Sequence, residues 1–371
     1  MRMPPMIDRR LLFNIDWILV GFVLTVSLLG ILNIYSATTP YKIIGMAYYL
    51  KQFYWMLGGM SVALLFSTVD YHLLEDFSYW FYGFLLVLLL VVLIMGRRSM
   101  GATRWLHLGF FNVQPSELMK IVIIVTFAGF FNNFHSDGGL TVKDLLIPLG
   151  LLVLPVALIM KQPDLGTAVL VILIAVSITF YVGLRWTTVV TFVCITIPLA
   201  WLGWYNFLKP YQKNRILDFI NPERSRLGSG YHIIQSKIAV GSGGIAGKGF
   251  VKGTQSQLRF LPEQHTDFAF SVFAEEWGFI GCLFLLLIYL SLILWGLNIA
   301  RRCNDRFGAL LAVGVTAMLF WHIVINVGMV IGMFPVVGVP LPFFSYGGTS
   351  MITSMVGIGL LQNISIRRFM F

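Results

Sequence analysis

Charge is scarce in this chain. Only 11% of its 371 residues are Asp, Glu, Lys or Arg, and 58% are hydrophobic. Ordinary soluble domains carry about 25% charged residues, so the composition indicates an integral membrane protein. The few charges still sum to +10. Because the basic residues lie at helix ends and in loops, membrane topology and one long loop explain this excess, and no nucleic-acid partner is expected.

The chain also lacks the common signatures of disulfide, metal and nucleotide chemistry. Its three cysteines are an odd number and widely spaced, which gives no disulfide framework and no zinc spacing. It has no H-E-x-x-H motif, and no Asp-x-Asp pair of the kind that soluble glycosyltransferases use with nucleotide sugars. Residues 241–249 are rich in glycine but do not fit the phosphate-binding pattern G-x-x-x-x-G-K-S/T. This segment is interpreted as a mobile hinge that allows close approach.

Ten long apolar segments predict membrane helices, since a helix needs about 20 mostly apolar residues to cross a bilayer. The segments are 15–35, 50–69, 76–95, 116–132, 144–161, 165–183, 187–206, 267–298, 308–333 and 344–363. No repeat or low-complexity linker divides the chain, so residues 1–371 are predicted to form one domain. The predicted fold is an all-α integral membrane protein with about ten transmembrane helices and one large extracytoplasmic loop.

Basic residues in the short loops predict the orientation. Ten Lys and Arg lie on the side of the chain termini and six lie on the other side, when the long loop is left out. Positive charge is enriched on the cytoplasmic side of membrane proteins. Both termini are therefore predicted in the cytoplasm and the long loop outside. Arg97, Arg98 and Arg104 weaken the bias, because they fall on the outer side.

The loop at 207–265 is the longest interruption between apolar segments, at 59 residues. It contains nine Lys and Arg against three Asp and Glu, so it carries +6 of the chain's +10. Basic charge gathered beside a membrane favours an anionic partner such as phosphate. We therefore expect the chemistry of this protein at the loop.

Two charged residues stand inside the fourth apolar segment. Pro115 suits the first position of a helix, and Glu117 and Lys120 then share one face near the outer surface. Charges within apolar spans are costly and usually functional. Two interpretations remain open: a structural ion pair that fixes helix packing, and a polar cavity open to the outer leaflet.

Acidic residues also stand at the start of two further helices. Asp164 follows a tight connection, where an acid interacts favourably with the helix dipole. Asp267 lies where the long loop enters a helix, and Glu275 and Glu276 follow it. Residues 267–276 are expected at the outer surface or in a cleft. Asp267 is either a capping acid or a general base; the helix dipole would lower its pKa and desolvation would raise it.

Seven motifs occur in consistent order over nearly the whole chain. They are GATRW at 101–105, QPSE at 114–117, QPDLG at 162–166, GYHIIQSK at 230–237, GTQSQ at 253–257, FLPEQHTDF at 260–268 and PVVGVPLPFFSYGGTS at 335–350. Together they resemble the SEDS family, named for shape, elongation, division and sporulation. The loop motif GTQSQ is similar to the elongation branch of that family rather than to the division branch.

The resemblance implies a peptidoglycan glycosyltransferase that polymerises lipid II at the outer face of the bacterial cytoplasmic membrane, for cell-wall elongation and rod shape. It implies that Asp267 is the essential catalytic carboxylate. The motifs and the loop further supply candidate substrate-binding residues, which are Arg104, Glu117, Lys120, Asp164, Arg215, Gln235, Lys237, His265 and Ser345. Departure of a lipid pyrophosphate needs positive charge, from loop Lys and Arg or from a divalent cation such as Mg or Mn. No organic cofactor is expected.

The expected partners follow from the same resemblance. They are lipid II (undecaprenyl-pyrophosphate disaccharide pentapeptide), a class B penicillin-binding protein that supplies the transpeptidase, and other membrane proteins of the elongation machinery. Two other functions remain open: a lipid II flippase and a non-catalytic scaffold. A flippase needs a polar path through the membrane, and few charges lie at mid-span or in the inner halves of the segments.

Overall fold

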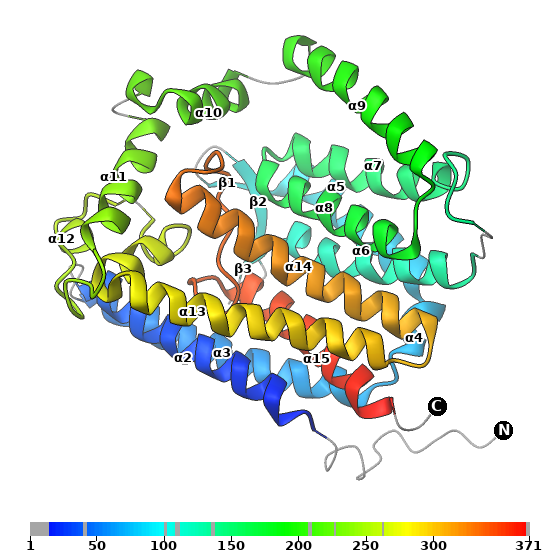
Figure 1. Ribbon diagram of the computed structural model, residues 1–371, viewed down its shortest axis with the longest axis horizontal. Helices are drawn as coiled ribbons and strands as arrows, with labels where there is room; N and C mark the ends of the chain where they lie inside the picture. Colours follow the sequence, from blue (N-terminus) through cyan, green and yellow to red (C-terminus); the bar gives the residue numbers. More distant parts are fainter. Residues whose placement is uncertain are drawn as a thin grey trace.

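The computed structural model describes residues 15–39, 43–99, 102–107, 112–134, 138–206, 210–225, 228–261 and 263–368. Within them, long helices form a bundle, and the helices of the 207–265 loop lie at the end of the bundle away from the chain termini (Figure 1). The long helices are α2 (Trp17–Thr38), α3 (Ile43–Thr68), α5 (Ser78–Met95), α6 (Pro115–Asn132), α7 (Leu146–Lys161), α8 (Leu165–Val182), α9 (Trp186–Asn206), α13 (Ala269–Arg302), α14 (Arg306–Ile331) and α15 (Gly348–Arg367). The short α4 (His72–Asp76) links α3 to α5.

A helix covers each of the ten predicted segments. Among the described residues, seven helices are long and apolar enough to cross a membrane, namely α2, α6, α8, α9, α13, α14 and α15. α5 and α7 contain shorter apolar helical stretches. The protein is thus an all-α membrane protein, as predicted, and the count of ten spans stays a prediction.

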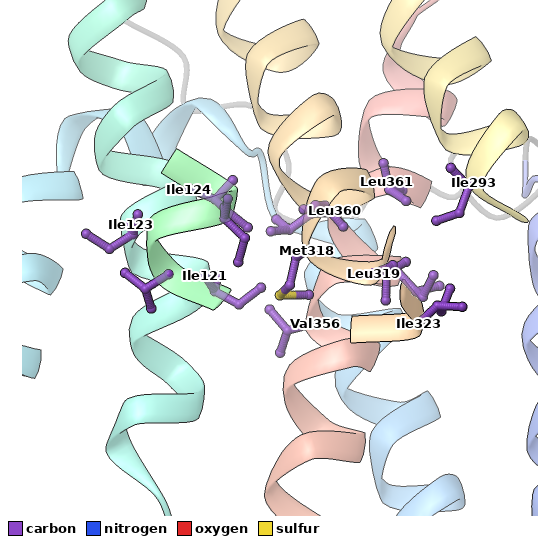
Figure 2. Packing of buried hydrophobic residues seen from close by; sticks show 14 of the residues in the cluster. Ile121, Ile123, Ile124, Ile293, Met318, Leu319, Ile323, Val356, Leu360 and Leu361 are labelled. Carbon is purple, nitrogen blue, oxygen red and sulfur yellow. The ribbon is translucent and has the colours of Figure 1, made fainter. Parts of the chain in front are cut away.

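The centre of the bundle is α14, which packs against α6, α8, α13 and α15. Figure 2 shows the apolar side chains that meet there, including Ile124 of α6, Met318 of α14 and Leu360 of α15. Lipid is as apolar as these side chains, so helices in a membrane associate through close packing. Gly314 of α14 provides such packing, because a Cβ at that position would lie 2.5 Å from the Ile124 side chain.

A small antiparallel sheet between α5 and α6 is absent from the sequence prediction. Its strands are β1 (Arg97–Ser99), β2 (Ala102–His107) and β3 (Asn112–Val113), in the order β1-β2-β3. Strands this short show too little alternation to be recognised. The sheet packs against the ends of α5 and α6 and fixes the position of Arg104 and Trp105 in β2.

The 207–265 loop is mostly helical. It contains α10 (Pro210–Ile220), the 3₁₀ helix η2 (Pro222–Ser225), α11 (Ser229–Ser242) and α12 (Thr254–Gln257). Its glycine-rich segment packs against a break in α13 at Gly278, where φ is 64° and ψ is −162°. Four backbone hydrogen bonds of 2.9–3.1 Å join residues 244–249 to residues 275–280. The prediction of close approach is confirmed, whereas the interpretation as a mobile hinge is wrong, because the backbone is paired.

Two buried glutamates hold the loop in place. Glu275 is fully buried, and its Oε1 lies 2.6 Å from Nζ of Lys248 and 3.1 Å from the backbone nitrogen of Gln255. Glu276 is also buried and accepts a hydrogen bond from Ser36 of α2. These acids were expected at the outer surface or in a cleft. Instead they connect α13 to the loop and to α2.

Gly247 provides a test of this packing. Its φ is +78°, and a Cβ there would lie 2.1 Å from the carbonyl oxygen of Glu276. We expect Gly247→Ala to lower the free energy of unfolding by about 1–3 kcal/mol, through overpacking against backbone that cannot move aside. The matched control is Gly244→Ala, because Gly244 has a φ of +55° and no neighbour within 4 Å of an added Cβ. Equal losses for the two variants, measured by unfolding in detergent, would show that packing at Gly247 is unimportant.

Candidate active site

A cavity of about 740 Å³ lies where the loop meets the helix bundle. Its walls come from α3, β2, β3, α6, α8, α10, the turn before α13, and residues 337–340 and 346–350. The charged residues that line it are Lys51, Arg104, Glu117, Asp164, Arg215, Glu263 and Asp267. Convergent charges of both signs in one concave site suit a polar ligand.

A second cavity, of about 410 Å³, lies between α6, α7, α8 and α9. Its described lining residues are apolar except for two threonines, and none carries a charge. Acid–base chemistry needs titratable groups. The polar cavity is therefore the candidate active site.

Asp267 lies in the turn of residues 263–268, just before α13. It lines the polar cavity, and its Oδ2 lies 3.1 Å from the position that a Cβ on Gly338 would occupy. The start of α13 has no side-chain cap hydrogen bond. The interpretation of Asp267 as a capping acid is therefore wrong.

The surroundings of Asp267 raise its pKa from the ordinary value of 3.8 to about 6. Desolvation is the largest cause, and the nearby negative charge of Glu263 adds to it. The positive charges of Arg104 and Arg215 act in the opposite direction. Desolvation thus prevails over the effects that lower the pKa. A carboxylate with this pKa is ionised at neutral pH and is a stronger base than an ordinary Asp.

Arg104 and Asp164 are linked in the cavity wall. Nη1 of Arg104 lies 3.7 Å from Oδ1 of Asp164, and the guanidinium also donates to the carbonyl of Pro163. Asp164 accepts hydrogen bonds from Nε2 of Gln114 and Oγ1 of Thr167, both at 2.8 Å. The predicted role of Asp164 at the start of α8 is confirmed. The same carboxylate also holds Arg104 beside the cavity.

Glu117 and Lys120 form a buried ion pair, with 2.9 Å between Oε2 and Nζ. Nζ of Lys120 also lies 2.7 Å from Nε2 of His322 in α14. His322 Nδ1 is 2.7 Å from the carbonyl oxygen of Met318, so Nδ1 carries the ring proton and donates it in that hydrogen bond. Nε2 therefore accepts a hydrogen bond from Lys120. Glu117 lines the cavity, whereas Lys120 lies behind it. The structural interpretation is confirmed, because the pair joins α6 to α14, and Glu117 faces a polar cavity, whereas the opening of that cavity to the outer leaflet stays a prediction.

Five predicted substrate-binding residues are not among the residues that line the cavity: Lys120, Gln235, Lys237, His265 and Ser345. Lys237 is exposed on α11 and covers the end of α14. The ring of His265 packs against Tyr48, with 4.6 Å between centroids. Oγ of Ser345 accepts a hydrogen bond of 3.0 Å from the backbone of Leu341. Their substrate-binding roles stay predictions, and the contacts of Lys237, His265 and Ser345 lie within the fold around the site.

Lys51, Trp55 and Glu263 are among the lining residues that the sequence analysis did not assign to the site. Lys51 and Trp55 are four residues apart on α3, which places them on one face. This spacing is a usable signal, but it does not show that the face borders a cavity. Glu263 stands in a predicted motif, four residues before Asp267.

The described residues contain no group of three or more His, Cys, Asp or Glu side chains that could hold a metal ion. The donors nearest to such a role are Asp267 and Glu263, whose charges interact across the cavity wall. Magnesium often binds through only one or two carboxylates together with substrate phosphates. The donor set therefore fits a cation that is shared with a phosphorylated substrate, and does not fit a site made by the protein alone.

Residues 16–369 match the family model of the cell cycle proteins FtsW, RodA and SpoVE. The chain belongs to this family. The resemblance to the SEDS family that the motifs indicate is thereby confirmed, over nearly the whole chain.

Relatives and solved structures of the FtsW/RodA/SpoVE family agree with this assignment. The chain is 42% identical to the peptidoglycan glycosyltransferase MrdB of Escherichia coli K12, over 84% of each chain. It is 33% identical to the peptidoglycan glycosyltransferase RodA of Treponema pallidum, over 96% of this chain and 98% of the relative. The rod shape determining protein RodA of Thermus thermophilus has the same fold, with a TM-score of 0.71 and 29% identity over 96% of this chain and 98% of that one.

Proposed function

We propose that this protein is a peptidoglycan glycosyltransferase that polymerises lipid II at the outer face of the cytoplasmic membrane, with Asp267 as its general base. The activity class is supported by the family and by relatives that bear this name over most of the chain. One observation carries the assignment of Asp267: it lines the same cavity as Arg104 and Arg215. A base and two cations are therefore available to one pair of bound substrates.

The reaction joins two lipid-linked sugars. Asp267 takes the proton from the acceptor hydroxyl as its oxygen forms a bond to the anomeric carbon of the donor. The bond from that carbon to the lipid pyrophosphate breaks, and the pyrophosphate leaves with the electron pair. Arg104 and Arg215 stabilise the negative charge that develops on the leaving group. Attack opposite the leaving group inverts the anomeric carbon, from an α-linked pyrophosphate to a β-glycosidic bond.

A divalent cation, Mg or Mn, is a second part of the proposal. Asp267 and Glu263 would hold it together with the substrate pyrophosphate, in the manner usual for magnesium. When bound, it would neutralise charge on the departing pyrophosphate.

The pH dependence of polymerisation should report the ionisation of Asp267. With a pKa of about 6, the carboxylate is ionised at pH 7 and becomes protonated as the pH falls through 6. A protonated Asp cannot accept the hydroxyl proton, so kcat/KM should fall about tenfold for each pH unit below that pKa. The measurement is the initial rate of glycan formation by purified protein between pH 5 and 8, with folding checked at each pH. A flat profile down to about pH 5 would contradict the assignment.

We propose a class B penicillin-binding protein as the principal partner, together with other membrane proteins of the elongation machinery. A chain of a solved peptidoglycan synthase complex that coordinates polymerization and crosslinking is 32% identical to this one, with a TM-score of 0.82. The match covers 96% of this chain and 99% of that one. A transpeptidase partner would supply the crosslinking step, for which this chain has no assigned site.

The flippase and scaffold alternatives can be separated from the enzyme by one assay. Purified protein is given lipid II in detergent micelles, which have no two faces and so require no translocation. The enzyme forms glycan polymer under these conditions when the partner is present. A flippase or a scaffold leaves lipid II unpolymerised.

The orientation in the membrane is also a proposal, with both termini in the cytoplasm and the 207–265 loop outside. We expect a membrane-impermeant thiol reagent added outside intact cells to label a cysteine at position 229 and to miss one at position 304. The background must replace the native Cys194, Cys282 and Cys303. Labelling at 304 without labelling at 229 would reverse the topology, and labelling after lysis provides the control for reactivity.

A further inference from the structure

Asn326 is a fully buried residue of α14 that bridges two walls of the polar cavity. Its Nδ2 donates hydrogen bonds to the carbonyl oxygens of Asp267, at 3.0 Å, and Val339, at 2.7 Å. A side-chain amide has two N–H donors, so both are used. The opposite orientation of the amide would bring its oxygen against two carbonyl oxygens. The two acceptors therefore fix the side chain in one orientation.

The contribution of Asn326 lies in these two hydrogen bonds. Its own Oδ1 is buried and has no hydrogen-bond partner among the described residues. A buried, unpaired oxygen is unfavourable, and a leucine of similar shape would avoid it. Packing alone would thus be served at least as well by leucine. What asparagine adds is the connection between Asp267 and Val339.

Gly338 explains why this connection matters for the carboxylate. It precedes Val339, has a φ of +71°, and faces Oδ2 of Asp267, which lies 3.1 Å from the place of a Cβ. Any side chain at this position would press on the carboxylate. Asn326 therefore connects the backbone of Asp267 to that of Val339. Val339 follows Gly338, which the Asp267 carboxylate contacts.

We infer that Asn326 is a positioning residue for Asp267. Asn326 fixes the turn before α13 relative to residues 337–340, so that the Asp267 carboxylate points into the cavity beside Gly338. Asn326 itself does not line the cavity, so it acts through Asp267. The inference rests on the proposed function, because it requires Asp267 to be the base. Misplacement of a reacting group by about 1 Å can reduce a rate by about 100-fold.

Two variants test the inference from different sides. Asn326→Leu keeps the approximate shape and removes both hydrogen bonds, and Gly338→Ala places a methyl group against the carboxylate. Each is purified as the full chain and assayed for polymerisation of lipid II across the pH range. We expect kcat to fall by about 10–100-fold in both. In Asn326→Leu, KM should stay within about threefold of wild type, because none of the residues that line the cavity is changed.

Matched controls separate positioning from loss of stability. Asn363 of α15 is also fully buried, and its Nδ2 likewise donates to two carbonyls, those of Phe66 and Val69, away from the polar cavity. Asn363→Leu should destabilise the protein at least as much without changing kcat, because it also removes the hydrogen bond from Nε of Arg367 to Oδ1 of Asn363. Gly183 has a φ of +103° and no neighbour within 4 Å of an added Cβ. Gly183→Ala should therefore reproduce backbone strain alone.

The comparison with Asn363→Leu supplies a readout that a purely structural role would not give. Loss of two buried hydrogen bonds alone would lower the rate alike in both variants. A positioning role lowers kcat in Asn326→Leu and leaves it unchanged in Asn363→Leu.

The outcomes are distinct. A reduced kcat in Asn326→Leu, with Asn363→Leu near wild type, supports the inference, and a reduced kcat in Gly338→Ala with Gly183→Ala near wild type supports the sensitivity of the carboxylate to its position. Wild-type kcat in folded Asn326→Leu, or an equal loss in Asn363→Leu, overturns the inference. If Asn326→Leu is not recovered folded, Asn326→Ala, which also removes both hydrogen bonds, is assayed in its place. Asp267→Asn is assayed in parallel. If it is active, Asp267 is not the base and the proposed function fails at that residue. If it is inactive while Asn326→Leu has wild-type kcat, Asp267 remains the base and only the positioning role of Asn326 is wrong.

Discussion

Asp267→Asn should reduce polymerisation of lipid II by about 10²–10⁴-fold, which corresponds to about 3–5 kcal/mol of activation free energy. Asparagine keeps the size of the side chain but has neither the charge nor the basicity that the acceptor hydroxyl requires. The pKa of about 6 makes the wild-type carboxylate a base suited to neutral pH. If the carboxylate also holds a divalent cation, the loss should be larger. The measurement is the yield of glycan polymer from purified protein, at matched amounts and with the partner present.

Glu223→Gln is the matched control for this experiment. Glu223 is an exposed acid of the same loop, in η2, and is not among the residues that line the cavity. Its neutralisation should leave polymerisation unchanged, and both variants should insert into the membrane and bind the partner normally. Near wild-type polymer from Asp267→Asn would remove the assignment of Asp267. The non-catalytic scaffold would then become the better interpretation.

Patterns that are local in the sequence predict much of this protein. Apolar runs identify the helices, because the bilayer sets their length. Pro115 marks the start of α6, and Asp164 marks the start of α8. The ion pair between Glu117 and Lys120 follows from their spacing on a helix. In each case the partners lie within one or two turns of the same helix.

Contacts between distant residues could not be predicted in this way. His322 contacts Lys120 across 202 residues, and Asn326 contacts Asp267 across 59. His322 and Asn326 are four residues apart on α14 and so share a face, but this spacing does not show which distant residues they contact. The paired backbone of residues 244–249 is a similar case. Its glycines indicate close approach, but the break at Gly278 that receives them is visible only in the structure.

The same limit applies to the residues of the cavity. Motif membership identifies Arg104, Asp164 and Asp267, all of which line it. It equally suggests His265 and Ser345, which instead support the surrounding fold. A sequence motif contains both cavity-lining residues and residues that support the fold. Only the structure distinguishes a side chain that faces the cavity from one that faces away.

Breaking the buried pair of Glu117 and Lys120 should have the largest effect on stability. Glu117 is 5% exposed and Lys120 is 1% exposed, so either partner left alone would be a buried, uncompensated charge. We expect Glu117→Gln or Lys120→Met to lower the free energy of unfolding by about 3–5 kcal/mol. Both should also impair polymerisation, since Glu117 lines the cavity and the pair holds α6 against α14.

The double variant Glu117→Gln/Lys120→Met should be clearly less destabilised than the sum of the two single variants, because it leaves no unpaired charge. A cycle on Asp70 and Arg367 provides the control. That pair is 3.2 Å apart at the end of α15, but the Asp70 side chain is 36% exposed. Its coupling should be no more than about 1 kcal/mol, as for other solvent-exposed pairs. Unfolding in detergent measures both cycles, and additive losses at Glu117 and Lys120 would mean that the two charges do not stabilise one another, whatever the distance between them.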